Sequence, residues 1–390
     1  MLKILQISNY MYPNIGGIEQ VARDIAQSIA TVDGYEQKII CFNETASDDG
    51  YVCNRQETVH DIVDGIEVIR CGCFTKKASQ SLSLTFGKEL KNVMESFEPD
   101  VVIFHYPNPF EAYYLLKYQE CNFKLILYWH LDIVKQKILG KVFHYQTLKL
   151  LNRADVIVAT SPLYIDGSSY LSKYRSKCVI IPNCIDEKRL EITDGIREKT
   201  MKIRQGNPNK IICFGIGRHI SYKGFSYLIE ASKYLDERFQ IFIGGKGELT
   251  DKLIKQAADD KKIVFLGRIS NEDTIAYYLA MDIFCFPSIT KNEAFGIALA
   301  EAMYFGKPAV TFNISGSGVN YVCINGETGI EVENRNVKAY AEAIKKLADD
   351  AELRQKYGNV ARRHVLKNFT YKIFENNILE LIKNWRCSKI

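Results

Sequence analysis

The sequence contains no apolar run as long as the roughly 18–20 residues that a membrane-spanning helix needs. Its 11 cysteines are an odd number without a Cys-x-x-Cys pair, which argues against a zinc site or a disulfide framework. Cys41, Cys213 and Cys285 fall inside strand-like apolar runs, where a reduced thiol packs as a small hydrophobe. The opening residues lack the long apolar region of a signal peptide and are expected to form a buried strand. These absences predict a reducing, cytoplasmic location.

Several motifs of catalysis and binding are also missing. There is no serine nucleophile elbow, Walker A loop or protein-kinase signature. Gly215-Ile-Gly217 lacks the third glycine of a dinucleotide fold, and Gly244-Gly-Lys-Gly247 has no Ser or Thr after its lysine. No Asp-x-Asp pair occurs, and no basic run with interleaved aromatics indicates a nucleic-acid partner. The sequence therefore predicts neither a metal site nor nucleic-acid binding.

Short apolar strands alternate with helix-length segments along the whole chain. At 390 residues, with 47% apolar and 25% charged residues, the chain has the length of two globular domains. A first series of strands is expected at residues 4–7, 37–42, 68–70, 101–104, 124–128, 156–159 and 178–181. A second series is expected at residues 210–216, 240–244, 263–266, 283–287, 309–312 and 328–332. Continuous apolar strands separated by helices indicate parallel sheets covered on both faces.

The two series predict an α/β fold with two doubly wound, Rossmann-like domains. We expect a first domain over residues 1–185, a second over 186–370 and a final helix, within 371–390, that packs back across the first domain. Ligands of such sheets bind at the carboxyl ends of the strands, so a cleft between the domains is expected. Residues 1–186 hold 19 Lys and Arg against 21 Asp and Glu, a net charge of −2. Because the whole chain carries +5, the remaining residues carry +7. A basic second half suits a polyanionic ligand.

Glu293 and Glu301 lie eight residues apart in a segment that we predict to be a loop feeding a helix, which ends at Gly306. Eight helical residues rise about 12 Å, close to the span of a nucleotide-sugar. The helix N-terminus between the carboxylates suits a diphosphate. An amphipathic helix with two solvated glutamates is the alternative. Small side chains in this segment let a ligand approach the backbone, which favours a binding site over solvated glutamates. These small residues are Ala294, Gly296, Ala298, Ala300 and Ala302.

Two turns that follow predicted strands carry further candidates. Gly16-Gly17 precedes a predicted helix, so that paired glycines and a helix N-terminus favour phosphate there. An ordinary strand–helix turn is the alternative and would be favoured if the motif stood alone. Arg218 offers a forked set of donors and Lys223 a point charge, both suited to a diphosphate. A solvated surface pair is the alternative, but the position at the carboxyl end of a strand favours binding.

His105 and His130 each end a predicted buried strand of the first domain. A lone histidine in such a place is more often structural. His130, flanked by aromatic residues and followed by Asp132, is the better candidate for contacting a sugar hydroxyl or a leaving phosphate.

Taken in order, these motifs resemble the retaining GT-B glycosyltransferases of family 4, a large group related to bacterial polysaccharide and lipid-sugar transferases. The resemblance covers nearly the whole chain. The matching segments are Pro13…Gly16-Gly17-Ile-Glu19, Trp129-His130-Leu-Asp132, Ala154-Asp155, Ile181-Pro-Asn183-Cys-Ile-Asp186, Gly217-Arg218…Lys223-Gly224, Gly245-Lys-Gly247-Glu-Leu249, Phe265-Leu-Gly267-Arg268, Phe286-Pro287-Ser288, Glu293…Glu301 and Gly326-Glu-Thr-Gly329.

The resemblance implies a role for each matching position. Glu301 would bind the ribose hydroxyls, Glu293 the transferred sugar, and His130 the same sugar from the first domain. Arg218 and Lys223 would stabilise the departing diphosphate. The other donor contacts implied are Gly16 and Gly17 over the diphosphate, Arg268 and Ile269 at the base, and Ala294 with the backbone N–H groups of Phe295, Gly296 and Ile297.

The same resemblance implies an enzyme that needs neither a metal nor a cofactor and that retains the anomeric configuration, by front-face attack through an oxocarbenium-like ion pair. No residue is a secure covalent nucleophile. Leu131 stands where relatives often carry Gly or Ser, which weakens the assignment of His130.

Basic residues gather in the part of the first domain that would hold the acceptor. Within residues 117–153, Glu120 and Asp132 are outnumbered by Lys117, Lys124, Lys135, Lys137, Lys141, Lys149 and Arg153. Together with the apolar residues of a predicted helix over 138–151, they form a basic amphipathic face. We expect this face to dock on the anionic inner leaflet of the cell membrane. A core-facing helix with solvated lysines is the alternative.

The resemblance implies transfer of a hexose from a UDP- or GDP-sugar to a lipid-linked or growing cell-surface polysaccharide, such as O-antigen or capsule. One alternative is a synthase that glycosylates a soluble sugar or sugar phosphate. Another is a non-catalytic relative that only binds nucleotide-sugars. Donor, acceptor, linkage and oligomeric state do not follow from the sequence.

Overall fold

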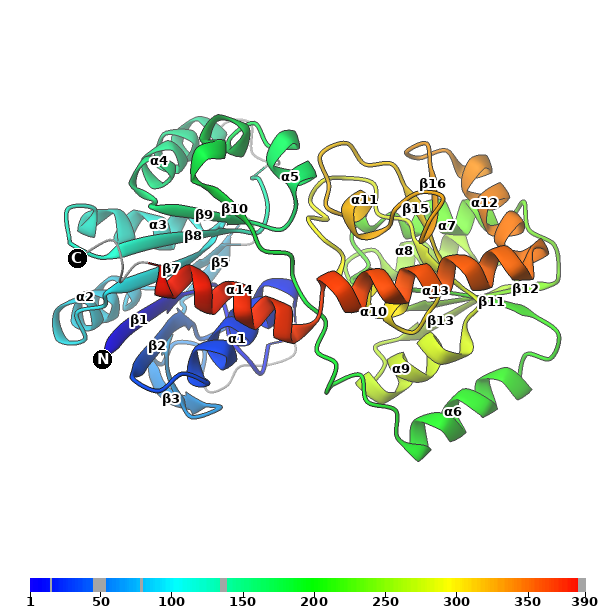
Figure 1. Cartoon of the computed structure of the whole chain (residues 1–390), viewed down its shortest axis with the longest axis horizontal. Coiled ribbons are helices and arrows are strands. Elements are labelled where there is room, and N and C mark those ends of the chain that lie inside the picture. Colours follow the sequence, from blue (N-terminus) through cyan, green and yellow to red (C-terminus); the bar gives the residue numbers. More distant parts are fainter. Residues whose placement is uncertain (15, 45–53, 78–79, 134–138, 385–390) are drawn as a thin grey trace. The chain divides into compact units, whose positions relative to one another are not determined.

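The structure is a computed structural model that describes all residues except 15, 45–53, 78–79, 134–138 and 385–390. Its contacts divide the chain into two compact units. Unit 1 comprises Met1–Thr160, Ser168–Ile181 and Phe374–Ile390, and unit 2 comprises Ser161–Gly167 and Pro182–Ile373. In each unit a sheet carries helices on both faces (Figure 1).

Unit 1 is built on an eight-stranded sheet of order β10-β9-β8-β7-β1-β2-β4-β3. Neighbouring strands are parallel except for β3 and β4. The strands are β1 (Leu2–Ile7), β2 (Tyr35–Phe42), β3 (Val59–Val63), β4 (Ile66–Cys71), β7 (Val101–Tyr106), β8 (Lys124–Trp129), β9 (Val156–Ala159) and β10 (Cys178–Ile180), with a separate antiparallel pair, β5 (Thr75–Lys77) and β6 (Gln80–Leu82). The helices are α1 (Gly17–Ala30), α2 (Phe86–Ser96), α3 (Pro109–Leu115), α4 (Leu139–Arg153), α14 (Tyr371–Lys383) and the 3₁₀ turns η1 (Leu116–Tyr118) and η2 (Leu171–Lys177).

Strands β7 and β8 show why this sheet is covered on both faces. Every residue of the two strands is buried, as expected for central parallel strands with apolar sequences. Lys124 is buried in β8 although it is charged. Its Nζ donates to the carbonyl of Leu381, in α14, at 2.8 Å. Burial lowers the pKa of this lysine. This hydrogen bond satisfies the buried ammonium and fixes α14 against the sheet of unit 1.

Unit 2 contains a six-stranded, fully parallel sheet of order β13-β12-β11-β14-β15-β16. The strands are β11 (Ile211–Ile216), β12 (Phe239–Gly244), β13 (Ile263–Gly267), β14 (Ile283–Phe286), β15 (Ala309–Phe312) and β16 (Gly329–Val332). The helices are α5 (Pro162–Gly167), α6 (Asp194–Gln205), α7 (Phe225–Ser232), α8 (Thr250–Gln256), α9 (Asn271–Ala280), α10 (Ile297–Tyr304), α11 (Val319–Val322), α12 (Val337–Asp349), α13 (Ala351–Asn368) and the 3₁₀ turn η3 (Ser221–Lys223).

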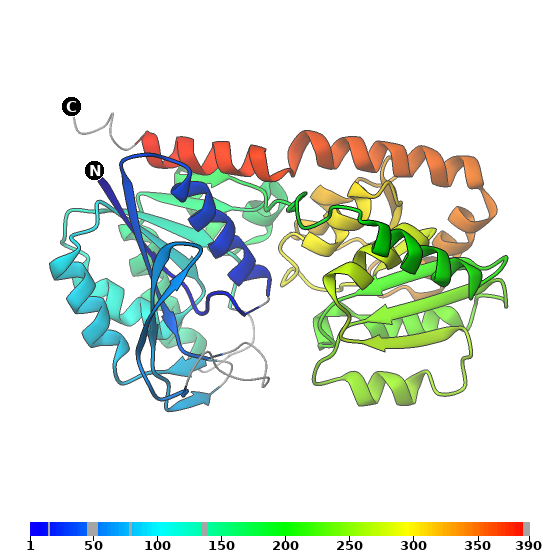
Figure 2. The ribbon, with the colours of Figure 1, turned by 90° about the horizontal axis from the view of Figure 1, so that it is seen from below.

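The strand order of unit 2 locates a binding place. On one side of β11 lie β12 and then β13, and on the other side lie β14, β15 and β16 in that order. This is the order of a dinucleotide-binding fold, in which ligands bind where the order reverses, beyond the carboxyl ends of the strands. In unit 2 that switch point lies between β11 and β14. Figure 2 shows the strands between helices that cover both faces, and α7 contacts both α8 and α12, whereas α6 contacts α9 and α10 contacts α13.

The predicted doubly wound fold is confirmed, and every predicted strand position overlaps a strand of the structure. Three short strands were not predicted: β3, β5 and β6. β3 lies at the sheet edge and is only partly buried, so its sequence does not read as an apolar run. A tight turn with positive φ at Asp64 and Gly65 pairs it with β4. The final helix ends at Lys383, and Trp385, which was predicted to belong to it, lies outside the described residues.

Candidate functional site

Two loops at the switch point of unit 2 form the first part of the site. One follows β11 and the other follows β14. The N–H of Ile289 donates to the carbonyl of Tyr222 at 2.9 Å, which ties the loops together. Gly224 has a φ of +66°, and a Cβ there would lie 2.0 Å from the carbonyl oxygen of Pro287. Only glycine permits this close approach.

Lys223 and Glu293 form an ion pair where these loops meet. Nζ of Lys223 lies 2.5 Å from Oε2 of Glu293, and the side chains are 16% and 11% exposed. The hydroxyl of Ser288 donates to the same carboxylate oxygen at 3.0 Å. Burial disfavours the Lys223 ammonium, but the Glu293 carboxylate outweighs it, so the pKa of Lys223 lies above its ordinary value. Lys223 therefore keeps its positive charge, which is held against the Glu293 carboxylate and largely shielded from water.

Tyr222 connects Arg218 to this pair. Burial, followed by the charge of Glu293, raises the pKa of Tyr222, whereas Lys223 and Arg218 act in the opposite direction. Nζ of Lys223 also lies 5.3 Å from the centre of the Phe286 ring and 5.8 Å from that of Tyr222. Arg218 itself is exposed. The structure thus gathers Arg218, Lys223 and Glu293 in one place.

The predicted helix N-terminus lies between the two glutamates. Helix α10 begins at Ile297, and its N-cap, Gly296, has a φ of +93°. Within the described residues, the backbone N–H groups of Phe295, Gly296 and Ile297 donate no hydrogen bond. They are available to an anion at the positive end of the helix.

The predicted helical spacing of about 12 Å between the glutamates is wrong. Glu293 lies in the loop before α10, so only the second half of the interval is helical. Tertiary contacts hold that loop instead: the Ser317 hydroxyl donates to the Glu293 carbonyl. Gly318 lies so close that a Cβ on it would be 1.9 Å from the Ala294 carbonyl oxygen. Helix propensity alone could not reveal these tertiary contacts.

Glu301 is a buried carboxylate with two defined partners. Nη2 of Arg189 donates to its Oε1, and the hydroxyl of Tyr278 donates to its Oε2 at 3.0 Å. Burial, followed by the charge of Glu301, raises the pKa of Tyr278 well above its ordinary value. The tyrosine therefore stays a hydrogen-bond donor, and the carboxylate keeps a fixed orientation.

Arg189 also connects Glu301 to the loop that was predicted to border the base. Nδ2 of Asn271 donates to the Arg189 carbonyl at 2.8 Å. Asn271 is the first residue of α9 and follows Arg268 and Ile269, which are exposed and half-buried respectively. The predicted ribose and base contacts therefore share one neighbourhood of unit 2.

The sequence assigned no role to Arg189, Tyr278, Tyr222 or Ser288, although Ser288 lies in a segment that matches the family. Arg189 lies just after the predicted boundary between the two domains, at residue 185, where no site residue was predicted. One local signal was present: Asp186 accepts hydrogen bonds from the backbone N–H groups of Lys188 and Arg189 through Oδ1, a turn that Asp typically forms. The tertiary partner of the arginine has no local signal, because Glu301 lies 112 residues away.

In unit 1 the predicted glycines begin α1. Gly16 is the N-cap and is extended, with a φ of −165°. A Cβ on Gly16 would lie 2.2 Å from Oε2 of Glu19 and would displace that buried carboxylate, whereas a Cβ on Gly17 would meet nothing within 4 Å. Glu19 thus explains Gly16 structurally, and the exposed backbone at Gly17 remains open to a ligand.

His130 follows β8 and is linked to two other buried polar side chains. Its Nε2 lies 3.0 Å from Nδ1 of His105, whose Nε2 lies 3.0 Å from Oε1 of Gln6. Burial lowers the pKa of His105 to about 3. Burial and then His105 lower the pKa of His130 well below its ordinary value. Asp132 does not contact His130 through a described hydrogen bond; it accepts from Trp129 Nε1 at 3.0 Å and from the Ser168 hydroxyl at 2.8 Å.

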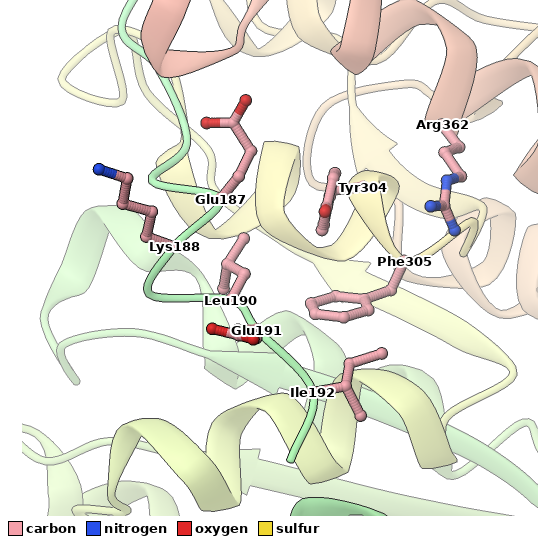
Figure 3. A pocket seen from close by; sticks show the side chains of 8 residues that line it. All are labelled: Glu187, Lys188, Leu190, Glu191, Ile192, Tyr304, Phe305 and Arg362. Carbon is pink, nitrogen blue, oxygen red and sulfur yellow. The ribbon is translucent and has the colours of Figure 1, made fainter.

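A surface pocket of about 380 Å³ lies beside the Glu301 region of unit 2 (Figure 3). It is lined by Glu187, Lys188, Leu190, Glu191, Ile192, Tyr304, Phe305 and Arg362. None of the predicted site residues lines it, although its walls flank Arg189 and follow Glu301 by one helical turn. The chemistry described above lies outside this hollow.

Other predicted features concern metals and membranes. Over the part of the chain that the structure describes, no group of three or more His, Cys, Asp or Glu is placed to hold a metal ion, and no helix is long and apolar enough to cross a bilayer. The described cysteines form no disulfide bonds. Of the predicted basic face, Lys135 and Lys137 lie outside the described residues, and Lys141 falls in α4.

The fold and this arrangement of charges define a class, and comparison with known proteins identifies it. The profile of "Glycosyltransferase Family 4" matches residues 15–189, and that of "Glycosyl transferases group 1" matches residues 196–364. A D-rhamnosyltransferase of Pseudomonas aeruginosa is 30% identical over 87% of this chain and 89% of its own length. An O-antigen chain mannosyltransferase of Escherichia coli is 28% identical over 95% of both chains. The chain belongs to the family 4 GT-B glycosyltransferases and is a glycosyltransferase.

Solved structures agree with the GT-B fold. Sucrose-phosphate synthase from Thermosynechococcus elongatus superposes with a TM-score of 0.81 at 17% identity, over 100% of both chains. An Anabaena protein in complex with UDP-glucose superposes with a TM-score of 0.76 at 17% identity, over 98% of this chain and 100% of its own. Both confirm the predicted fold class.

Proposed function

We propose that this glycosyltransferase moves a hexose, with retention of configuration, from a UDP- or GDP-sugar to a lipid-linked or growing cell-surface polysaccharide. The observation that carries the proposal is the buried Lys223–Glu293 pair beside the open N-terminus of α10. A cation and free N–H groups at one switch point suit the diphosphate of a nucleotide-sugar. The name of the Escherichia coli relative, an O-antigen chain mannosyltransferase, supports a polysaccharide acceptor.

The geometry suggests how the chain stabilises the departing diphosphate. Breaking the bond between the anomeric carbon and the phosphate oxygen leaves negative charge on the nucleoside diphosphate. Lys223, Arg218 and the N–H groups at the start of α10 would meet that charge as it develops. In this proposal they supply the charge that a divalent ion supplies in metal-dependent transferases.

Glu293 would bind the transferred sugar rather than attack it. One of its oxygens is already occupied by Lys223 and Ser288, which reduces its nucleophilicity and fixes its position. Front-face attack by the acceptor hydroxyl on an oxocarbenium-like ion pair therefore fits better than a covalent intermediate. His130 would contact the same sugar, Gly16 and Gly17 the diphosphate, and Arg268 and Ile269 the base.

The decisive experiment is a donor screen followed by analysis of the product. UDP- and GDP-linked hexoses, with mannose and rhamnose among them, are tested for thermal stabilisation and then for slow donor hydrolysis. The anomeric configuration of the transferred sugar is read by NMR. An inverted product would refute the retaining mechanism, and donor binding without hydrolysis or transfer would support a non-catalytic role.

We also propose peripheral contact with anionic membrane through α3 and α4, which contact each other. Tyr113 and Tyr145 are 57% and 64% exposed. Nζ of Lys117 lies 4.8 Å from the Tyr113 ring, and Nζ of Lys149 lies 4.8 Å from the Tyr145 ring. Exposed tyrosines beside lysines suit the headgroup region of a bilayer.

Vesicle flotation tests the membrane proposal. Wild type should float with vesicles containing anionic lipid, and the variant Lys117→Glu/Lys149→Glu/Tyr145→Ser should not. Unchanged flotation of this variant would refute contact through this surface. The charge-matched control Lys252→Glu/Lys255→Glu, on α8 of unit 2, should float like wild type.

A further inference from the structure

Three polar side chains form a buried chain of hydrogen bonds in the centre of unit 1. Gln6 lies on β1, His105 on β7 and His130 directly after β8, and these three strands are neighbours in the sheet. Gln6 and His105 are completely buried, and His130 is 6% exposed. Burial of such groups in an apolar sheet interior costs free energy that hydrogen bonds offset. All but one of the polar atoms that link these side chains are paired: Nε2 of Gln6 has no partner among the described residues.

The amide of Gln6 sets the direction of every donor in the chain. The structure places its oxygen, which can only accept, against Nε2 of His105 at 3.0 Å and leaves its own Nε2 without a partner among the described residues. In this orientation of the amide, Nε2 of His105 carries the proton. A neutral imidazole has one donor and one acceptor, so Nδ1 of His105 must accept. Its partner at 3.0 Å, Nε2 of His130, then donates. His130 is left with an unprotonated Nδ1.

That remaining nitrogen has no hydrogen-bond partner among the described residues. We propose that Gln6 and His105 are positioning residues that lock His130 in its neutral Nε2–H tautomer, so that its Nδ1 accepts a hydrogen bond from a hydroxyl of the transferred sugar. This inference rests on the proposed function. It also decides between two possible partners of His130, because an unprotonated nitrogen attracts a hydroxyl and cannot donate to a phosphate oxygen.

The surroundings keep both rings neutral and aligned. The planes of His105 and His130 are 11° apart, with centroids 5.2 Å apart, and Tyr128 stacks on His130 at 4.9 Å. The lowered pKa values of both histidines agree with a relay that carries no charge. A second proton would break it, because two adjacent donors cannot hydrogen-bond to each other.

Tautomer-resolved NMR on protein labelled with nitrogen-15 at histidine tests the lock directly. The signals of His130 are assigned by their loss in His130→Asn. Wild type should show a protonated Nε2 and an unprotonated Nδ1 from pH 7 down to pH 5. In His105→Phe, which keeps a ring but removes the relay, the two tautomers should mix. A protonated Nδ1 in wild type, as the opposite orientation of the Gln6 amide would give, overturns the proposal.

Kinetics tests what the lock is for. His105→Phe and Gln6→Leu should each lower kcat/KM for the intact donor by about 3- to 10-fold, the worth of one neutral hydrogen bond. Donors that each lack one sugar hydroxyl identify the hydroxyl that His130 binds. The donor without that hydroxyl should be transferred equally by wild type and His105→Phe. The exposed His60→Phe, in the same unit, is the control for loss of a histidine and should match wild type. Equal loss with every deoxy donor would indicate a merely structural role.

The two readouts separate this inference from the proposed function. A locked Nε2–H tautomer in a protein that transfers no sugar would refute the proposed function and leave the relay intact. An active enzyme whose tautomer and kcat/KM are unchanged in His105→Phe would refute the relay alone.

Discussion

At the scale of single residues, the two glutamates differ in what holds them. Glu293 is paired with a buried cation, whereas Glu301 is held by an arginine and a tyrosine. In the proposed function, the first arrangement would hold charge near the diphosphate and the second would orient a carboxylate towards the ribose diol. The two glutamates would then serve different steps.

This difference predicts distinct kinetic effects of Glu293→Ala and Glu301→Ala. Glu293→Ala should lower kcat on the order of 100-fold with little change in donor affinity, because it disturbs a charge arrangement that acts in the transition state. Glu301→Ala should weaken donor binding and turnover together. Steady-state kinetics and calorimetric donor titration measure both. Glu272→Ala, at an exposed position of α9, is the control, and equal turnover of Glu293→Ala and wild type would contradict the assignment.

The variant Arg189→Met tests whether the arginine strengthens or weakens binding of the donor's nucleoside. We expect donor Kd to rise about 10-fold with kcat nearly unchanged, because Glu301 loses a charge-assisted hydrogen bond that orients it. Calorimetric titration with UDP and GDP measures the effect. Arg197→Met removes an exposed arginine that is paired only at 3.9 Å with Asp194 and should leave Kd unchanged. Tighter binding by Arg189→Met would show instead that Arg189 competes with the ribose for Glu301.

At the scale of elements, the two loops at the switch point fit together because their backbones approach closely at Gly224 and Pro287. Gly224→Ala combines a positive φ with a Cβ placed 2.0 Å from the Pro287 carbonyl oxygen. Gly326→Ala has a positive φ of +76° with nothing within 4 Å, and so isolates the backbone cost. That cost is about 1 kcal/mol. We expect Gly224→Ala to lose clearly more stability than Gly326→Ala in urea unfolding and also to weaken donor binding. Equal losses would mean that the two loops can separate freely.

The elements also show what the sequence could predict. Central strands such as β7 and β8 were predictable because burial on both faces demands continuous apolar residues. The edge strand β3 was not, because its residues are partly exposed and its pairing depends on a turn. In the candidate site, Lys223 was predicted from its place after a strand, and Glu293 from its spacing to Glu301 and the small residues between them. Arg189 and Tyr278 could not, because their roles depend on contacts between segments far apart in the chain.

At the scale of the whole molecule, each unit contributes its own buried polar groups, and one of them stands out. Glu111, near the start of α3 in unit 1, is completely buried, and neither of its carboxylate oxygens has a hydrogen-bond partner among the described residues. Burial raises its pKa well above the ordinary value of 4.5. Keeping such a group costs stability at neutral pH.

Glu111→Met should therefore stabilise unit 1, and the gain should depend on pH. Between pH 4.5 and the folded pKa, folded Glu111 holds a proton that the unfolded chain has released, so the wild-type free energy of unfolding falls as pH rises. The difference between variant and wild type should thus grow with pH, by up to about 1.4 kcal/mol per pH unit. Trp129 is buried in unit 1, so urea unfolding followed by its fluorescence, in variants that also carry Trp385→Phe, reports on that unit. Glu111→Gln, which keeps the size but cannot titrate, should show the same pH dependence. A difference that stays constant from pH 5 to pH 7 in both variants would mean that Glu111 is ionised inside the folded unit and has a partner that offsets its burial.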